Sequence, residues 1–221
     1  MGELSYRQRW GFFAALQHAL VERLSSRAGL HLYGIYLRPL DAVNAPEPAV
    51  PGYVVRLFTQ GDEHTLLAAA REPELELTET FVRTALGKGD VCAAILVDGQ
   101  IVSFAWSAFT PTRHRDSVYV SFDSRHRYGY FAFTLPAYRG RHLPRLPVPL
   151  RDRYCVARGC TQSISFISVD NRSSIRMATA IGNHRVGFAG YLKRGPIFFS
   201  FRTRAVREQG FRFFSPNTSL A

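Results

Sequence analysis

One segment of the chain combines glycine and arginine in a spacing that suits a phosphorylated ligand. It reads Leu135-Pro-Ala-Tyr-Arg-Gly-Arg-His-Leu143 and lies between a predicted strand and a predicted helix. A pyrophosphate needs several converging backbone N–H groups, which a tight turn before a helix supplies. Gly140 lets the backbone approach the phosphate oxygens, and Arg139 and Arg141 add charge-assisted hydrogen bonds. The segment therefore predicts an anion-binding loop.

A second segment follows one predicted strand later and opens the next helix. It reads Val169-Asp-Asn-Arg-Ser-Ser-Ile175. Asn171 suits two roles here, which are compatible with each other. It can cap the helix by accepting from the backbone of Ser173 or Ser174, or its amide can bond a ligand.

Together these segments resemble the GCN5-related N-acetyltransferase (GNAT) superfamily over residues 53–195. Members carry a V-x-P-x-Y-R-G-x-G-x-G loop, followed by N-x-x-S/A at the start of the next helix. The resemblance implies the GNAT acyl-CoA N-acyltransferase fold, an α/β fold whose mixed, mostly antiparallel twisted sheet has flanking helices. It also implies an enzyme that moves an acyl group from a pantetheine thioester to a small-molecule amine acceptor. The alternative is a catalytically degenerate GNAT-fold module that only binds.

The resemblance assigns the donor site residue by residue. Backbone groups at the end of the preceding strand would meet the pantetheine arm, the loop would hold the pyrophosphate, and the next helix would bond the donor arm. In that order the residues are Phe133, Thr134 and Leu135; Arg139, Gly140, Arg141 and His142; and Asn171 with Ser174.

Two kinds of acyl donor are compatible with this loop. Acetyl-CoA or a longer acyl-CoA is the family expectation. However, the later loop glycines of the family are His142 and Pro144 here, and proline has no N–H to offer. Acyl carrier protein, which presents pantetheine through one phosphate on an acidic surface, is the alternative. A cluster of arginines is predicted to face this carrier protein, with a solvated helix face as the alternative. Its members are Arg139, Arg141, Arg145, Arg151, Arg153 and Arg158.

Acyl transfer needs a group that moves protons between the amine and the leaving thiolate. Many GNATs use a tyrosine on the helix after the asparagine, but that position is Ala178 here. Tyr130 and His126, on and just before the strand that leads to the loop, are the predicted catalytic residues. His114, His126 and His142 lack metal-ligand spacing, so no metal is expected.

The elements that must position these residues follow from hydrophobic periodicity. Strands are predicted at 31–37, 53–58, 91–97, 100–109, 117–122, 128–135, 163–169, 184–192 and 196–202. Helices are predicted at 5–26, 62–70, 74–87, 149–157 and 172–181. Asp98-Gly99 predicts a two-residue hairpin. The helix between the strands at 128–135 and 163–169 makes a crossover, so these two strands should be parallel.

The predicted domain division places an N-terminal amphipathic helix, a short strand and a proline-rich linker in residues 1–50. The GNAT domain follows at 51–205 and a tail at 206–221. Apolar residues in the helix recur every three or four positions, at Tyr6, Trp10, Phe13, Leu16, Leu20 and Leu24. This stripe predicts docking on the domain or on a second copy in a homodimer. Peripheral membrane contact through helix 5–26 is the alternative.

Composition limits the partners and the compartment. The formal net charge is +11, and all but Lys88 and Lys193 of the 28 basic residues are Arg. Nucleic acid is disfavoured as a partner, because the aromatic residues in 122–133 alternate along a strand as core residues do. The 3 cysteines form no C-x-x-C pair, and the sequence predicts neither a signal peptide nor an apolar membrane span. We therefore expect a cytoplasmic protein.

Overall fold

The computed structural model describes residues 6–40 and 50–216. Its contacts divide the chain into two compact units that are interleaved in sequence. The terminal unit comprises residues 1–37, 112–123 and 166–221, and the central unit comprises residues 38–111 and 124–165. The predicted boundaries at residues 50 and 205 instead divide the chain into consecutive segments, and this division stays a prediction.

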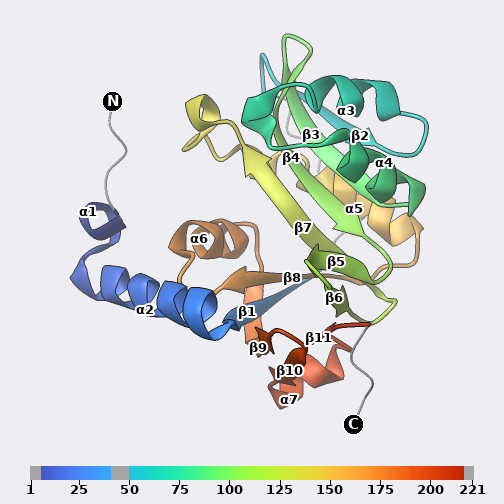
Figure 1. Ribbon diagram of the computed structural model, residues 1–221. Helices are drawn as coiled ribbons and strands as arrows, with labels where there is room; N and C mark the ends of the chain where they lie inside the picture. Colours follow the sequence, from blue (N-terminus) through green and yellow to red (C-terminus); the bar gives the residue numbers. More distant parts are fainter. Residues whose placement is uncertain (1–5, 41–49, 217–221) are drawn as a thin grey trace. The chain divides into compact units, whose positions relative to one another are not determined.

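In its described residues, the terminal unit contains two antiparallel sheets and four helices (Figure 1). In the first sheet β9 lies between β1 and β10, and in the second β6 lies between β5 and β11. The strands are β1 (Leu30–Pro39), β5 (Thr112–Arg115), β6 (Val118–Ser121), β9 (His184–Arg194), β10 (Ile197–Arg202) and β11 (Arg212–Phe214). The helices are α1 (Tyr6–Trp10), α2 (Phe12–Ala28), α6 (Arg172–Ala180) and α7 (Arg204–Glu208).

Aromatic side chains form the core of this unit. Tyr191 on β9 packs against Phe213 on β11, with ring centroids 5.1 Å apart, and Tyr33 on β1 lies 5.2 Å from Phe213. Val206 and Phe211 are fully buried. These residues show why the segment predicted as a tail folds as it does: its apolar residues fill the core of the terminal unit.

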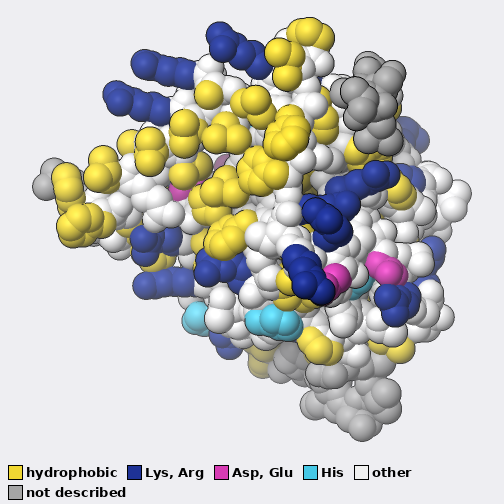
Figure 2. All heavy atoms as spheres, turned by 90° about the horizontal axis from the view of Figure 1, so that it is seen from below, with side chains coloured by type: hydrophobic (Ala, Val, Ile, Leu, Met, Phe, Trp, Pro, Cys, Tyr) yellow, Lys and Arg dark blue, Asp and Glu magenta, His cyan; other side chains and the backbone are white. Residues whose placement is uncertain are grey.

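The N-terminal helix differs from its prediction in two ways. It breaks at Gly11, whose φ of 86° lies in the left-handed region that glycine tolerates. Moreover, the apolar stripe does not dock along its whole length. Tyr6 and Trp10 contact the unit, through a hydrogen bond to the Asp170 carbonyl and a cation–π contact with Arg176. The four stripe residues of α2 are exposed, and hydrophobic side chains form a band across the face shown in Figure 2.

The central unit contains a sheet in the order β8-β7-β4-β3-β2. Every neighbouring pair is antiparallel except β7 and β8, which are parallel as predicted. The strands are β2 (Val54–Phe58), β3 (Val91–Val97), β4 (Gln100–Ala108), β7 (His126–Thr134) and β8 (Gln162–Ser168), whose last residues belong to the terminal unit. The helices are α3 (Glu63–Ala69), α4 (Glu79–Gly87) and α5 (Val148–Ala157), with 3₁₀ turns at Pro73–Leu75, Pro136–Tyr138 and Leu143–Arg145.

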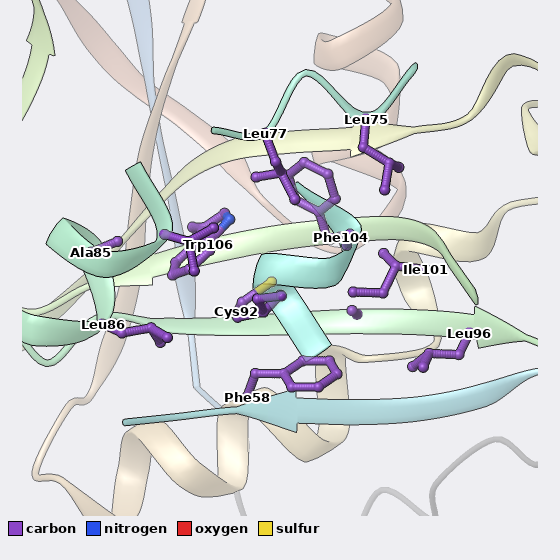
Figure 3. Close-up of a cluster of buried hydrophobic side chains, with 14 residues drawn as sticks. Phe58, Leu75, Leu77, Ala85, Leu86, Cys92, Leu96, Ile101, Phe104 and Trp106 are labelled. Atoms are coloured by element: carbon purple, nitrogen blue, oxygen red, sulfur yellow. The ribbon is translucent and has the colours of Figure 1, made fainter. Parts of the chain in front are cut away.

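The two faces of this sheet have different coverings. Alternate strand residues such as Cys92 and Trp106 pack under α3 and α4 (Figure 3). On the opposite face Ile95 and Val102 pack against Leu143, in the segment between β7 and α5. Leu143 therefore anchors the predicted anion-binding loop to the core.

Several local predictions are confirmed and others are wrong. Asp98 and Gly99 have φ angles of 49° and 79°, as the predicted hairpin turn requires. The helix predicted at 74–87 begins only at Glu79, because the Thr78 side chain accepts from the Phe81 N–H and caps it there. Hydrophobic periodicity did not predict β5, α7 and β11, because each is too short to show a clear repeat of apolar residues.

Within the described residues, no helix is long and apolar enough to cross a membrane.

Candidate functional site

The parallel pair β7 and β8 separates part of the way along β7. The two strands are in register from His126 opposite Gln162 to Tyr128 opposite Ile164. Beyond this point β7 continues to Thr134, paired with β4 on its other side. The edge of β7 that faces away from β4 therefore has no strand partner from Gly129 to Thr134 in the described structure. Such an edge offers main-chain hydrogen-bonding groups to a ligand.

A β-bulge lies in this unpaired stretch. Trp106 pairs with Tyr130 and Ala105 with Ala132, so Phe131 is the extra residue. Its φ of 40° is in the left-handed region, which a non-glycine residue adopts at a cost. A bulge bends its strand and increases the local twist. The bulge therefore bends β7 within the stretch that β8 does not pair with.

The loop after β7 presents its backbone to solvent. Gly140 has a φ of 79°, and nothing lies within 4 Å of the position where a Cβ would be. Within the described residues, the N–H groups of Gly140, Arg141 and His142 have no hydrogen-bond acceptor. His142 also has a positive φ, of 56°. Successive free N–H groups around such turns make an anion-binding concavity.

Both loop arginines are held by the protein itself. Arg139 Nε donates to the Thr134 carbonyl at 3.1 Å. Arg141 donates to the Tyr53 hydroxyl at 3.1 Å and to the Ala137 carbonyl at 3.2 Å. The guanidinium groups are thus positioned beside the free N–H groups while their side chains stay exposed. Preorganised cations of this kind bind an anion at a lower entropic cost.

The predicted catalytic Tyr130 is hydrogen-bonded to a carboxylate that sequence reasoning did not assign. Its hydroxyl donates to Asp90 Oδ2 at 2.6 Å, and Lys88 Nζ lies 3.0 Å from the same oxygen. Asp90 is 1% exposed, and its Oδ1 has no partner in the described structure. Burial, and then the neighbouring carboxylate, raise the pKa of Tyr130. The Tyr130 hydroxyl therefore stays protonated and donates its hydrogen bond to Asp90.

The Asp90 carboxyl gives a pH-dependent prediction. Burial raises its pKa above the ordinary value of 3.8, against the opposing effects of Tyr130 and Lys88. Because the folded state then holds the proton more tightly, this contribution to the free energy of unfolding is complete below pH 3.8 and is lost as the pH rises through the folded-state pKa. We expect Asp90→Asn to remove that decline, as measured by urea unfolding across acidic pH. Parallel pH profiles for both proteins would contradict this.

The other predicted residues lie apart from this pair. His126 is buried, and its Nε2 lies 3.1 Å from Gln162 Oε1, so it joins the start of β7 to β8. Asn171 and Ser174 belong to the terminal unit. There the Asn171 side chain accepts from the Ser174 N–H at 3.0 Å, which confirms the predicted helix cap. The ligand-binding roles of these residues stay predictions.

One residue of the predicted arginine cluster is not available to a carrier protein. Arg151 on α5 is buried, and burial lowers its pKa to about 9. It lies with two further buried arginines and one carboxylate: Arg38 forms a two-oxygen contact with Asp152 at 2.7 and 2.9 Å, and Arg127 donates to Ser107. The prediction fails because α5 turns this residue toward the sheet. The exposed arginines of the cluster are Arg139, Arg141, Arg145 and Arg158.

Comparisons with known proteins agree with this geometry at the level of the fold. No family profile and no curated protein sequence matches the chain. A GCN5-related N-acetyltransferase from Sphaerobacter thermophilus matches with a TM-score of 0.53 and 15% identity, over 87% of this chain and 57% of its own. A GNAT-family acetyltransferase from Novosphingobium aromaticivorans matches with a TM-score of 0.46 and 18% identity, over 71% of this chain and 60% of its own.

A smaller relative also matches. The aminoglycoside N-acetyltransferase AAC(6')-Iy, crystallised with CoA, has a TM-score of 0.46 and 16% identity, over 68% of this chain and 99% of its own. The chain thus spans under two thirds of the Sphaerobacter and Novosphingobium proteins. The Sphaerobacter protein, with a TM-score of 0.53 at 15% identity, is the match that bears on the fold. The chain therefore has the fold of the GNAT superfamily.

Proposed function

We propose that this protein is an N-acyltransferase that uses a pantetheine thioester as its acyl donor. The observation that carries the proposal is the separation of β7 from β8 immediately before the loop at Arg139–His142. The unpaired edge of β7 supplies main-chain groups for a pantetheine arm. The free N–H groups and two arginines of the loop supply partners for the phosphate end of the same donor.

The reaction proposed needs one proton to move. The acceptor amine attacks the thioester carbon, the carbon–sulfur bond breaks, and the proton lost by the amine balances the one gained by the thiolate. Tyr130 lies on the unpaired stretch of β7, and its hydroxyl oxygen can accept a hydrogen bond from the amine while its proton is donated to Asp90. This pair would orient the amine and stabilise positive charge that develops on it.

The donor is proposed to be an acyl-CoA, with acyl carrier protein as the second version. Crystals of AAC(6')-Iy contain CoA, which supports the first. The exposed arginines of the loop suit either a pyrophosphate or an acidic carrier surface. We further propose a small-molecule amine acceptor and a cytoplasmic location, in keeping with the free, buried thiols of Cys92, Cys155 and Cys160.

Thermal unfolding in the presence of candidate donors tests the proposal. Acetyl-CoA, palmitoyl-CoA and acylated carrier protein are each added in excess, and a donor that binds the folded state raises Tm. Stabilisation followed by release of free thiol with an amine mixture would support an enzyme. Stabilisation with no turnover would support the GNAT-fold binding module, and no stabilisation by any donor would contradict both.

Tyr130→Phe separates a catalytic role from a binding one. We expect the variant to lose kcat by about 10²- to 10⁴-fold, the usual size of a general acid–base contribution, with little change in the KM for the donor. The measurement is thiol release under saturating donor. His126→Gln serves as the comparison, because His126 is tied to Gln162 and should affect stability more than turnover. Unchanged turnover in Tyr130→Phe would remove the tyrosine from the mechanism.

A further inference from the structure

The terminal unit exposes an apolar surface that no part of the described chain covers. On α2, Phe13 is 83% and Leu20 is 58% exposed, and on β10 Phe199 is 62% exposed. We define the apolar surface by its six members: Phe13, Leu16, Leu20, Leu24, Ile197 and Phe199. Hydrophobic side chains form a band across this face in Figure 2, with Lys and Arg side chains along its sides. A patch of this kind on a monomer marks an interaction site.

The end of α2 is built against β9, which brings the two parts of this surface together. A Cβ on Gly29 would lie 2.0 Å from the Lys193 carbonyl oxygen, so the residue that ends α2 has to be glycine. The Lys193 N–H donates to the Gly29 carbonyl at 2.9 Å. Because β9 also pairs with β10, β9 connects the two elements that carry the exposed residues.

A basic pocket lies at the same end of α2. Its volume is about 380 Å³, and its lining includes four cationic side chains, Arg27, Arg115, Lys193 and Arg194, with Asp116 as the acidic one. Lys193 Nζ donates to Ser117 Oγ at 2.8 Å. Within the described residues, Arg27, Arg115 and Arg194 form no ion pair. The pocket therefore suits a ligand with a negatively charged group, such as a phosphate.

We propose that the terminal unit docks on an anionic lipid bilayer. The apolar surface would enter the boundary between headgroups and acyl chains, and the basic pocket would take a headgroup phosphate. Aromatic and leucine side chains beside arginines are the composition of helices that lie in a membrane interface. Basic side chains near an anionic surface add electrostatic attraction that falls off within a Debye length.

The charges favour lipid over a second copy of the chain. A symmetric dimer brings the same patch of both copies together. Both copies of the basic pocket would then add their charge to one interface, with Asp116 and Glu22 too few to balance it. An anionic bilayer neutralises the same cations, so charge complementarity selects it.

Vesicle sedimentation tests this docking with the full chain. We expect pelleting with vesicles of phosphatidylcholine plus phosphatidylglycerol, weak pelleting with phosphatidylcholine alone, and loss of binding at high salt. Phe13→Ser with Leu20→Ser should weaken partitioning by roughly tenfold or more, given the apolar area removed. Arg27→Glu with Arg194→Glu should abolish the preference for the anionic lipid.

Matched controls come from the central unit. Val54→Ser changes an exposed apolar residue and Arg83→Glu an exposed charge, and both should bind vesicles as the unmodified protein does. Circular dichroism confirms that each variant is folded. Absence of binding to either vesicle would overturn the proposal, as would a dimer in sedimentation equilibrium that Phe13→Ser dissociates. Vesicle binding is measured without any donor, so its failure is independent of acyl transfer.

Discussion

Replacing Arg139 and Arg141 together by alanine should raise the KM for an acyl-CoA donor by roughly tenfold or more, because two charge-assisted hydrogen-bonding groups are lost at its phosphate end. Both side chains are exposed and neither belongs to the buried core under α4, so the fold should be retained. The Tyr130–Asp90 pair is untouched, and kcat at saturating donor should stay close to that of the unmodified protein. Initial rates over a range of donor concentrations measure both constants.

The control for this experiment is Arg83→Ala. Arg83 is an exposed arginine on α4 whose partner, Glu79, is one helical turn away at 3.9 Å. It removes the same type of charge from the same unit but not from the loop, so the KM should be unchanged. If the loop variant and Arg83→Ala had equal KM values, the loop would not hold the donor. If kcat alone fell in the loop variant, the arginines would act on the reaction rather than on binding.

Trp106→Ala should lower the free energy of unfolding by about 3–5 kcal/mol, the usual cost of deleting a large buried aromatic side chain. Trp106 is 0% exposed and packs edge-to-face on Phe81, with ring centroids 5.1 Å apart. It lies under α4, in the cluster that holds this helix on the sheet (Figure 3). Urea unfolding followed by far-ultraviolet circular dichroism measures the loss.

A milder substitution at the same position gives the comparison. The indole Nε1 of Trp106 has no hydrogen-bond partner in the described structure, so Trp106→Phe loses volume but no hydrogen bond. It should cost clearly less than the alanine variant. Equal losses for the two variants would contradict the assignment of this contribution to the packed volume of the side chain. A loss below about 1 kcal/mol for alanine would mean that the site collapses around the cavity.

Much of the fold could be predicted from the sequence, because its signals are local. The hairpin at Asp98-Gly99 depends on two adjacent residues, and the cap at Asn171 bonds a residue three positions away. The parallel pairing of β7 and β8 followed from the single crossover helix between them. In each case the physical cause lies within one element or in the connection between two neighbours.

The candidate site was only partly predictable, because its contacts are distant in the chain. Tyr130 and Asp90 are 40 residues apart, and Arg38 and Asp152 are 114 residues apart. The sequence shows Asp90 only as an acidic residue directly before the predicted strand at 91–97. The apolar stripe of α2 shows a second limit: periodicity identifies an apolar face, but not what covers it.

The interleaving of the two units has a consequence for synthesis of the chain. The central unit is complete once residue 165 has been made, whereas the terminal unit needs β9, β10 and β11 from later in the sequence. Chains emerge from the ribosome at about 5–20 residues per second. For several seconds, β1 is therefore present with its apolar residues but without β9, the strand it pairs with. A nascent chain of this kind offers a binding site to chaperones at its N-terminal end, and its central unit can fold first.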